Sequence, residues 1–373
     1  MGTGLLGLPL AIVALSAMSL MGPVGNQLAV NFLISLVAVV GFGIYSGNSG
    51  IMTFGHAAFM GIAAYASGLL TVSPQIKRQA LPHLPAWIRD IQLPLLPAML
   101  IAMVIVLIVA VLFGVPFSRL SAAATPIATF TMLLITFVVL AGAKDLTRGS
   151  QTFYGLPPSV DIYVALVAAL LAIFVARRFR ESVLGLRLQA SREDELASRS
   201  MGVNVAYLRM IAWVLSALVV AVAGVLLGHE LTAFSPKQFY ISLQFMLVAM
   251  LVVGGQATVT GAVVGTFLVS LLMEGARRLE TYLNGLTIAG FTIQNVFGLQ
   301  EIVLGLLIIA VMFWRRDGLF DFDELDEKLR LLKMRRAARA QQRLAKQDPS
   351  NREPGGPSGR PGTSDQVDAA TRS

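Results

Sequence analysis

The chain has no cysteine, so disulfides, thiolate metal sites and cysteine nucleophiles are excluded from its chemistry. Charged residues are scarce, at 13% of the sequence. Histidine occurs only at positions 56, 83 and 229, and no HExxH pair is present. No GxxxxGK[ST] sequence occurs, so the chain lacks a phosphate-binding loop of the ATPase type. We therefore expect no catalytic residue, no metal site and no cofactor, and any ATP must be hydrolysed by a partner.

Apolar residues are abundant instead. They make up 55% of the 373 residues, and the mean hydropathy is +0.72. Ordinary soluble domains contain about 45–50% apolar residues even when glycine is counted. A helix of roughly 20 apolar residues crosses a bilayer, and the strongest candidates are Leu5–Met21, Leu28–Tyr45, Ile51–Thr71, Leu93–Phe113, Ala122–Gly142, Val160–Ala176, Leu208–Leu231 and Val296–Trp314. The composition predicts an all-α, polytopic transmembrane bundle.

Two further apolar segments are shorter. Ile241–Val253 and Ala262–Met273 fall near the 10 to 14 residues at which a segment is as compatible with a re-entrant loop as with a span. The expected number of spans is therefore about 8 to 10.

The segment from Arg177 to Arg209 interrupts the apolar pattern with a run of charges and cannot cross a bilayer. If this loop and the basic tail are both cytoplasmic, an even number of crossings separates them, and both termini lie inside. Lysines and arginines in the opposite loops weaken the charge bias that supports this orientation.

The domain organisation follows from these patterns. Residues 1–316 form the predicted transmembrane domain, which includes the polar loop 177–209. Residues 317–347 have acids first, bases later and leucines on one face, which predicts an amphipathic helix that binds the membrane surface or extends into solvent. Residues 348–373 are rich in Pro, Gly and Ser and are expected to be disordered. No basic and aromatic module indicates nucleic-acid binding.

Within the polar loop, a short helix is predicted with Ser191 as its N-cap, acids in its first turn and Gly202 as its C-terminal stop. Such a helix either docks on a partner or is a solvated connector. The residues that we assign to it are Ser191, Arg192, Glu193, Asp194, Glu195, Ala197, Met201 and Gly202.

Two glycine-containing breaks interrupt apolar segments, one at Ser46–Gly50 and one at Gly254–Gly261. Unwound backbone inside a membrane is tolerated only where protein or a cavity covers it, so such breaks indicate a central transport path. The candidates for the path are Asn48, Thr53, Gly55, His56, Gly61, Gly254, Gly255 and Thr258. For His56 the alternative is a hydrogen bond to a neighbouring helix, and Val106 is expected to face lipid.

Three stretches, SGNSGIMTFGHAAFMGIAAYASGLL, LGLRLQASREDELASRSMGVNVAYLRMIAWVLSALVVAVAGVLLGH and SPKQFYISLQFMLVAMLVVGGQATVTGAVVG, resemble the M-type permease of the branched-chain amino acid ABC importers. The resemblance covers about Leu28 to Trp314. The sequence departs from it at Thr147–Tyr154, where a glycine-rich stretch is usual, and in its long tail.

The resemblance implies a ten-span permease of a bacterial inner membrane. It further implies a second, H-type permease, two cytoplasmic ATP-binding subunits and an extracytoplasmic solute-binding protein as partners. Ribose-type sugar permeases and urea permeases are related. We expect a branched-chain or other hydrophobic amino acid as the solute, with urea or a short amide as the alternative. An ion-coupled secondary transporter, a channel and a scaffold subunit stay open.

Overall fold

The computed structural model describes residues 2–284, 287–288, 291–292 and 298–314. The chain divides into a unit of Met1–Glu324 and a unit of Leu325–Ser373. The predicted amphipathic helix at 317–347 and the predicted disordered tail at 348–373 lie outside the described residues.

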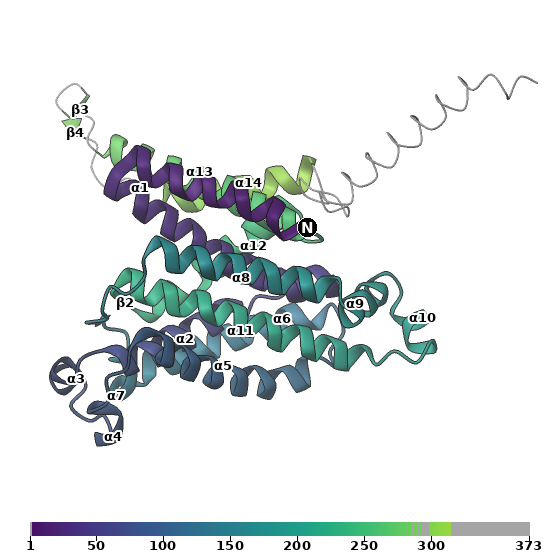
Figure 1. Ribbon diagram of the computed structural model, residues 1–373, viewed down its shortest axis with the longest axis horizontal. Helices are drawn as coiled ribbons and strands as arrows, with labels where there is room; N and C mark the ends of the chain where they lie inside the picture. Colours follow the sequence, from purple (N-terminus) through teal and green to yellow (C-terminus); the bar gives the residue numbers. More distant parts are fainter. Residues whose placement is uncertain (1, 285–286, 289–290, 293–297, 315–373) are drawn as a thin grey trace, which may run out of the picture. The chain divides into compact units, whose positions relative to one another are not determined.

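Helices dominate the described residues, and only two-residue strands accompany them (Figure 1). The first half contains α1 (Gly2–Ser49), α2 (His56–Thr71), α3 (Pro74–Ala80), α4 (Ala86–Arg89), α5 (Leu95–Phe117), α6 (Ala124–Gly142), α7 (Lys144–Thr147), β1 (Phe153–Tyr154) and α8 (Ile162–Arg180). The second half contains α9 (Val183–Glu193), α10 (Glu195–Ser200), α11 (Val205–Leu231), β2 (Ala233–Phe234), η1 (Pro236–Phe239), α12 (Ile241–Gly254), α13 (Val259–Leu283), β3 (Thr287–Ile288), β4 (Phe291–Thr292) and α14 (Leu299–Trp314). The all-α fold predicted from composition is confirmed.

In the part of the chain that the structure describes, seven helical segments are long and apolar enough to cross a membrane. The number is eight if α2 and the bent α3 form one span. The two apolar segments that looked short are longer in the structure. Residues 236–254 give a candidate of 19 residues, and α13 runs for 25. The α13 helix continues through its charged residues because Glu274 pairs with Arg277 and Arg278, three and four positions later on the same face. Both segments are therefore candidate spans rather than evident re-entrant loops.

The core of the unit is built around α11, which packs against α1, α2 and α5, while α1 also packs against α8. Trp213 of α11 lies at the centre of an aromatic cluster with Tyr45, Phe59 and Phe117 at ring-centroid distances of 5.4 to 5.7 Å. Small residues allow the close approach of these helices. A Cβ atom added to Gly224 of α11 would lie 2.3 Å from the carbonyl oxygen of Met60 in α2.

One face of α5 is buried at every fourth residue, at Ala98, Ala102, Val106 and Ala110. The expectation that Val106 faces lipid is wrong, because its side chain has no exposed area. A uniformly apolar helix gives no sequence signal for which face packs, and here the smaller residues mark the buried face. Leu112, which is 68% exposed, lies on the opposite side.

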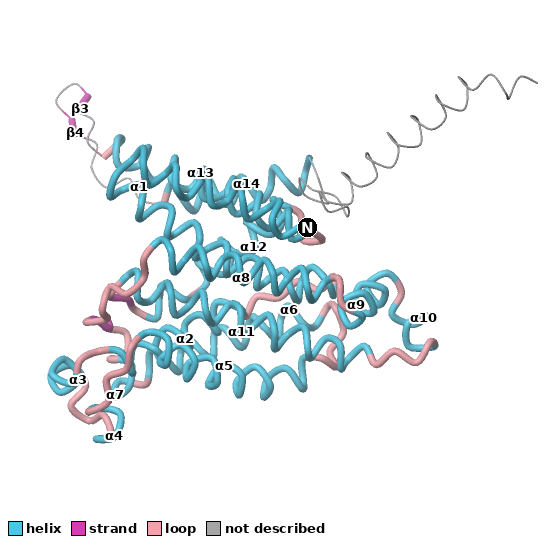
Figure 2. Tube along the Cα trace, viewed as in Figure 1, coloured by secondary structure: helices cyan, strands magenta, loops and turns pink. Residues whose placement is uncertain are grey.

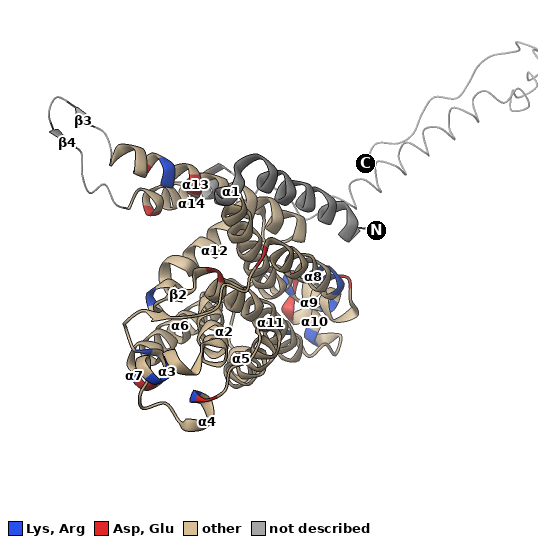
Figure 3. Ribbon diagram, turned by 60° about the vertical axis from the view of Figure 1, so that its left-hand side comes forward, with Lys and Arg blue, Asp and Glu red and all other residues tan. Residues whose placement is uncertain are grey.

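The connections of the unit gather at the two ends of its helices, around α3, α4 and α7 at one end and around α9 and α10 at the other (Figure 2). Lysine, arginine and acidic residues gather in the same two places, and further charged residues lie on α13 and α14 (Figure 3). The antiparallel pairing of Phe153 with Phe234 joins two connections at the α3 end. This separation of apolar spans from charged ends is typical of a multi-pass membrane protein.

Candidate functional site

The first break in the helices lies between α1 and α2. Gly50 ends α1 with φ +70°, and its amide donates to the carbonyl oxygen of Ser46 at 3.0 Å. The Ile51 amide donates to Ser49 Oγ at 3.2 Å. The chain is then non-helical until His56 begins α2. Glycine supports this sharp ending because it adopts positive φ without a Cβ clash.

Side chains from two other helices satisfy the backbone of this break. The Phe54 amide donates to Thr129 Oγ1 of α6 at 3.0 Å, and the Ala57 amide donates to Gln244 Oε1 of α12 at 2.9 Å. The Gln244 amide nitrogen in turn donates to the carbonyl oxygen of Thr53 at 3.4 Å. The first N–H groups of a helix have no partner within the helix. Protein groups supply partners here, as non-helical backbone inside a membrane requires.

His56 joins this break to α11 and α1. Its Nδ1 lies 3.0 Å from Thr53 Oγ1, and its Nε2 lies 2.7 Å from Ser216 Oγ. The Ser216 hydroxyl donates its one proton to the carbonyl oxygen of Gly41 at 2.7 Å, so it accepts from Nε2–H of His56. His56 has no exposed area, and it bonds to Ser216 of α11. This is the hydrogen bond to a neighbouring helix that the sequence left as the alternative for His56. Contact with a solute stays a prediction.

The second break lies between α12 and α13. Gly255 adopts φ +104°, and Thr258 Oγ1 caps α13 by accepting from the Gly261 amide at 3.0 Å. A Cβ atom on Gly254 would lie 1.9 Å from the carbonyl oxygen of Gly261. Glycine at position 254 therefore permits α12 and α13 to approach each other closely.

The two breaks touch. A Cβ atom on Gly47 would lie 2.4 Å from the carbonyl oxygen of Gln256. Asn48 from the first break and Gln256 and Thr258 from the second line one cavity of about 10 Å³, which is room for about one water molecule. The two breaks therefore form a closed contact in this structure.

All eight predicted path residues are buried in the described part of the chain. Five have the contacts given above or line the cavity between the breaks, and Gly255 has the positive φ given above. The other two pack tightly: a Cβ atom on Gly55 would lie 2.9 Å from the carbonyl oxygen of Thr129, and one on Gly61 would lie 3.0 Å from Cβ of Phe239. The structure thus brings Asn48, Gly254, Gly255 and Thr258 into one region, and Thr53, Gly55 and His56 into another along α2.

The predicted helix from Ser191 to Gly202 is two helices. Ser191 lies inside α9, where its Oγ donates to the carbonyl oxygen of Leu188 at 2.7 Å, so its prediction as an N-cap is wrong. Asp194 caps α10 instead, because its Oδ1 accepts from the Ala197 amide at 2.9 Å. Asp194 leaves the helical conformation with ψ 105°, which ends α9 and begins α10. Gly202 follows α10 with φ +80°, which confirms it as the stop.

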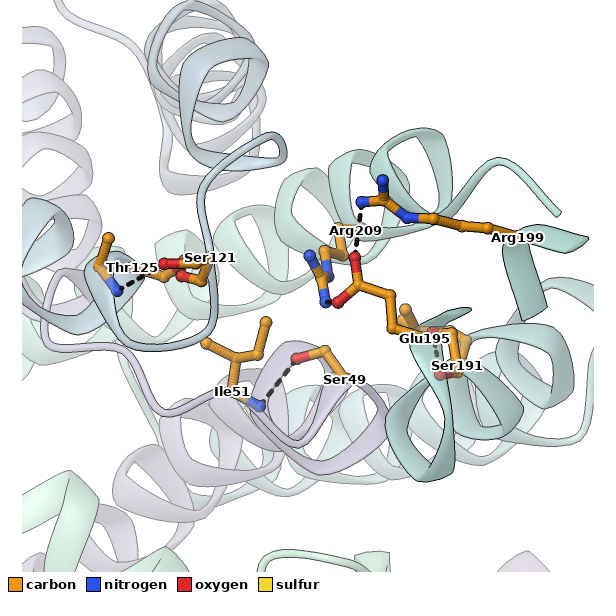
Figure 4. A network of polar contacts seen from close by, with 10 residues as sticks. Ser49, Ile51, Ser121, Thr125, Ser191, Glu195, Arg199 and Arg209 are labelled. Atoms are coloured by element: carbon orange, nitrogen blue, oxygen red, sulfur yellow. Dashed lines mark hydrogen bonds and ion pairs between the residues drawn. The ribbon is translucent and has the colours of Figure 1, made fainter. Parts of the chain in front are cut away.

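Glu195 holds α10 against α11 (Figure 4). Its Oε2 accepts from Nη2 of Arg209 at 2.8 Å and its Oε1 from Nη2 of Arg199 at 2.6 Å. Burial raises the pKa of Glu195, but hydrogen bonds and charge from Arg209 and then Arg199 outweigh it and leave the pKa below its ordinary value. The carboxylate is therefore ionised at neutral pH and tethers the loop.

The residues of this loop divide into an inner and an outer set. Ser191, Arg192 and Glu195 turn toward the helices, and Arg192 Nη1 donates to the carbonyl oxygen of Gly47 at 3.3 Å. Glu193, Ala197 and Met201 are exposed, and Leu196 beside them is 77% exposed. Met201, the residue that follows α10, is 84% exposed, so the end of α10 presents two large apolar side chains outward.

Sequence reasoning missed several residues that hold the site together, among them Thr129, Arg180, Arg209, Ser216 and Gln244. Thr129, Ser216 and Gln244 are lone polar residues inside apolar segments, and that isolation is the signal that marks them as inter-helix hydrogen-bond partners. The arginines carried no such signal, because basic residues at the ends of spans usually face water or headgroups.

Residues 26–312 match the sequence profile of a family described as "Branched-chain amino acid transport system / permease component". Among curated relatives, the high-affinity branched-chain amino acid transport system permease protein LivM of Escherichia coli (strain K12) is 27% identical over 186 residues, which is 48% of this chain and 40% of LivM. The L-arabinose transport system permease protein AraH of the same organism is 26% identical over 175 residues, or 45% of this chain and 47% of AraH.

The xylose transport system permease protein XylH of E. coli (strain K12) is 28% identical over 152 residues, which covers 39% of this chain and 36% of XylH. The chain thus spans less than half the length of each of these three relatives. The family profile covers far more of the chain than any of them and includes both helix breaks and the α9–α10 loop. The chain belongs to this family of ABC transporter permeases and is a multi-pass protein of the inner membrane.

Proposed function

We propose that this chain is the membrane-spanning permease subunit of an ABC importer for branched-chain or other hydrophobic amino acids. The family match over residues 26–312 carries the proposal. LivM supports the amino-acid substrate, and AraH and XylH support a sugar as the second candidate because their identity to this chain is similar. Urea or a short amide is the remaining alternative.

The α9–α10 end faces the cytoplasm in this proposal, and both termini lie on the same side. The ends of α8 and α11 together with this loop carry Arg177, Arg178, Arg180, Arg187, Arg192, Arg199 and Arg209. An excess of basic residues in short loops is typical of the cytoplasmic side. The α3 end also carries basic residues, so direct labelling of both ends is needed to test this orientation.

The outer face of α10 is the proposed docking surface for a cytoplasmic ATPase. Leu196 and Met201 are large apolar side chains, and Glu193 beside them is 77% exposed. An exposed helix face with apolar anchors fits a groove on a partner. The inner face is fixed to α11 through Glu195 and Arg209, so a displacement of α10 is transmitted to a membrane-spanning helix rather than absorbed by a loose loop.

The remaining partners in the proposal are a second, H-type permease, a second ATPase and an extracytoplasmic solute-binding protein. This chain has no ATPase loop of its own, so it acts as a transport subunit and takes its energy from the partner ATPases.

Crosslinking tests the proposed docking. A photoreactive residue at Leu196 in the assembled complex should form adducts with the ATPase, and the same residue at Trp87, which is 71% exposed in α4, should not. In liposomes, the complete complex should accumulate solute with ATP. Accumulation driven by a proton or sodium gradient without the ATPases would overturn the proposal in favour of an ion-coupled carrier.

A further inference from the structure

Two arginines, one at the end of α8 and one near the end of α9, contact the helix breaks. Arg180, the last residue of α8, donates from Nη1 to the carbonyl oxygen of Ala257 in the second break. Arg192, near the end of α9, donates from Nη1 to the carbonyl oxygen of Gly47 beside the first break. Each break therefore receives one guanidinium from the same loop.

The Gly47 carbonyl belongs to the last turn of α1. Such carbonyls lack a partner within the helix, and arginine side chains commonly supply one. The Ile51 amide, which would continue the helical pattern, donates to Ser49 Oγ instead. Arg192 also packs its methylene chain on Gly50, where an added Cβ atom would lie 2.7 Å from Arg192 Cγ. The glycine thus makes room for the arginine at the point where α1 ends.

The contact between the two breaks contains polar atoms without hydrogen bonds among the described residues. Asn48 Oδ1 and Gln256 Oε1 are such atoms, and both residues line the small cavity between the breaks. Separation of the breaks therefore costs no hydrogen bond from these atoms. Arg180 of α8 and Arg192 of α9 each supply a direct hydrogen bond to one of the breaks.

We infer that Arg180 and Arg192 are positioning residues that transmit movement of the α9–α10 loop to the two helix breaks. As the loop moves, the two breaks move apart or come into contact. The inference rests on the proposed function, because it needs an ATPase that moves this loop. The inference adds a route to that function. The movement reaches the contact between the two breaks through the carbonyl groups of Gly47 and Ala257, and not through packing of α10 alone.

The test uses the full complex of this chain, its partner permease, the ATPases and the binding protein in liposomes. The variants are Arg192→Gln and Arg180→Gln, with Arg192→Lys as the conservative replacement that keeps one donor. Arg178→Gln is the matched control, because Arg178 is an exposed arginine of the same turn as Arg180. Solute transported per ATP hydrolysed should fall about tenfold in the Gln variants, as for loss of one hydrogen bond from a charged donor. Arg192→Lys should recover part of the lost transport per ATP hydrolysed.

A structural role alone would reduce assembly or thermal stability and leave the ratio of transport to hydrolysis unchanged. Assembly, thermal stability and this ratio are therefore all measured. The chain has no cysteine, so the pair Asn48→Cys and Gln256→Cys, one from each break and both at the cavity, reports the junction by disulfide formation. The rate of crosslinking should differ between the nucleotide-free and ATP-trapped complexes. This difference should vanish when both arginines are Gln.

The two possible failures are distinct. If the native complex shows no ATP-dependent uptake, the proposed function fails and takes the inference with it. If the native complex transports solute but the Gln variants keep the native ratio and the nucleotide-dependent crosslinking, the inference alone is wrong.

Discussion

The side chain of Arg209, 6% exposed, donates from Nη2 to Oε2 of Glu195 at 2.8 Å and so ties the first turn of α11 to the first turn of α10. This pair fixes the angle at which α10 presents Leu196 and Met201. Arg199, on the other side of the same carboxylate, is 60% exposed and adds a solvent-screened partner.

Replacement of Arg209 by Met should destabilise the fold by about 1–2 kcal/mol, with the loss reduced because Glu195 keeps part of its exposure to water. Arg199→Met should cost less than about 0.5 kcal/mol, as for an exposed pair. The free energy of unfolding in detergent micelles measures both. Equal effects for the two arginines would show that burial of Arg209 contributes nothing.

The stability that the ion pair of Glu195 contributes should fall as the pH is lowered. Its folded-state pKa lies below the ordinary value of 4.5, so the carboxylate stabilises the folded state above that value and the contribution disappears as pH falls through the folded pKa. The difference in stability between the native chain and Glu195→Gln should stay constant between about pH 7 and about pH 5 and shrink at lower pH. A difference that grows on acidification would contradict the assignment.

Thr129→Val should destabilise the chain by about 1–3 kcal/mol, because it leaves the Phe54 amide without an acceptor in the break before α2. Thr131→Val is the control. Thr131 lies on the same helix and is exposed, and its hydroxyl donates to the Ile127 carbonyl oxygen one turn earlier. Thermal unfolding of the purified variants should separate them, and identical melting temperatures would exclude a role for Thr129 in holding the break.

Gly224→Ala should destabilise by about 1–3 kcal/mol, since the new methyl group would meet the backbone of Met60 in the close contact of α11 with α2. Gly142→Ala at the end of α6 meets nothing within 4 Å and should be neutral or stabilising by up to about 1 kcal/mol. Equal stability of the two variants would show that the approach of α2 to α11 is loose.

Gly61→Leu should reduce transport by obstructing the contact of α2 with Phe239. The comparison variant is Leu112→Phe, on the exposed face of α5, because Val106 is buried and cannot serve as a lipid-facing reference. Uptake is normalised to the amount of protein inserted. Equal uptake by the two variants would argue that α2 neither lines nor supports the path.

Sequence patterns predicted the fold class, five of the eight stronger span candidates and the location of both breaks, because apolar length and glycine content are local properties. Gly202 was recognisable as a helix stop for the same reason. Two other predictions differ from the structure: Leu5–Met21 and Leu28–Tyr45 lie in the one helix α1, and Val296–Trp314 gives a 16-residue helix, α14, that is not among the candidate spans. Ser191 was mistaken for an N-cap because two nearby polar residues hold the caps instead. Ser182 caps α9 by accepting from the Gly185 amide, and Asp194 caps α10 by accepting from the Ala197 amide. Gln244 and Ser216 form bonds to residues more than 150 positions away, which no local pattern reveals.

The most direct test of the central claim is uptake of labelled L-leucine into liposomes that contain the complete complex. The ATPase subunits face the interior of the liposomes, which contains ATP and a system that regenerates it. Uptake should require ATP, resist competition by L-arabinose, D-xylose and urea, and be lost when Leu196 and Met201 are both replaced by Asp. Uptake of a sugar or urea in place of leucine would contradict the proposed substrate, and leucine uptake that persists without ATP would contradict the role as an ABC importer permease.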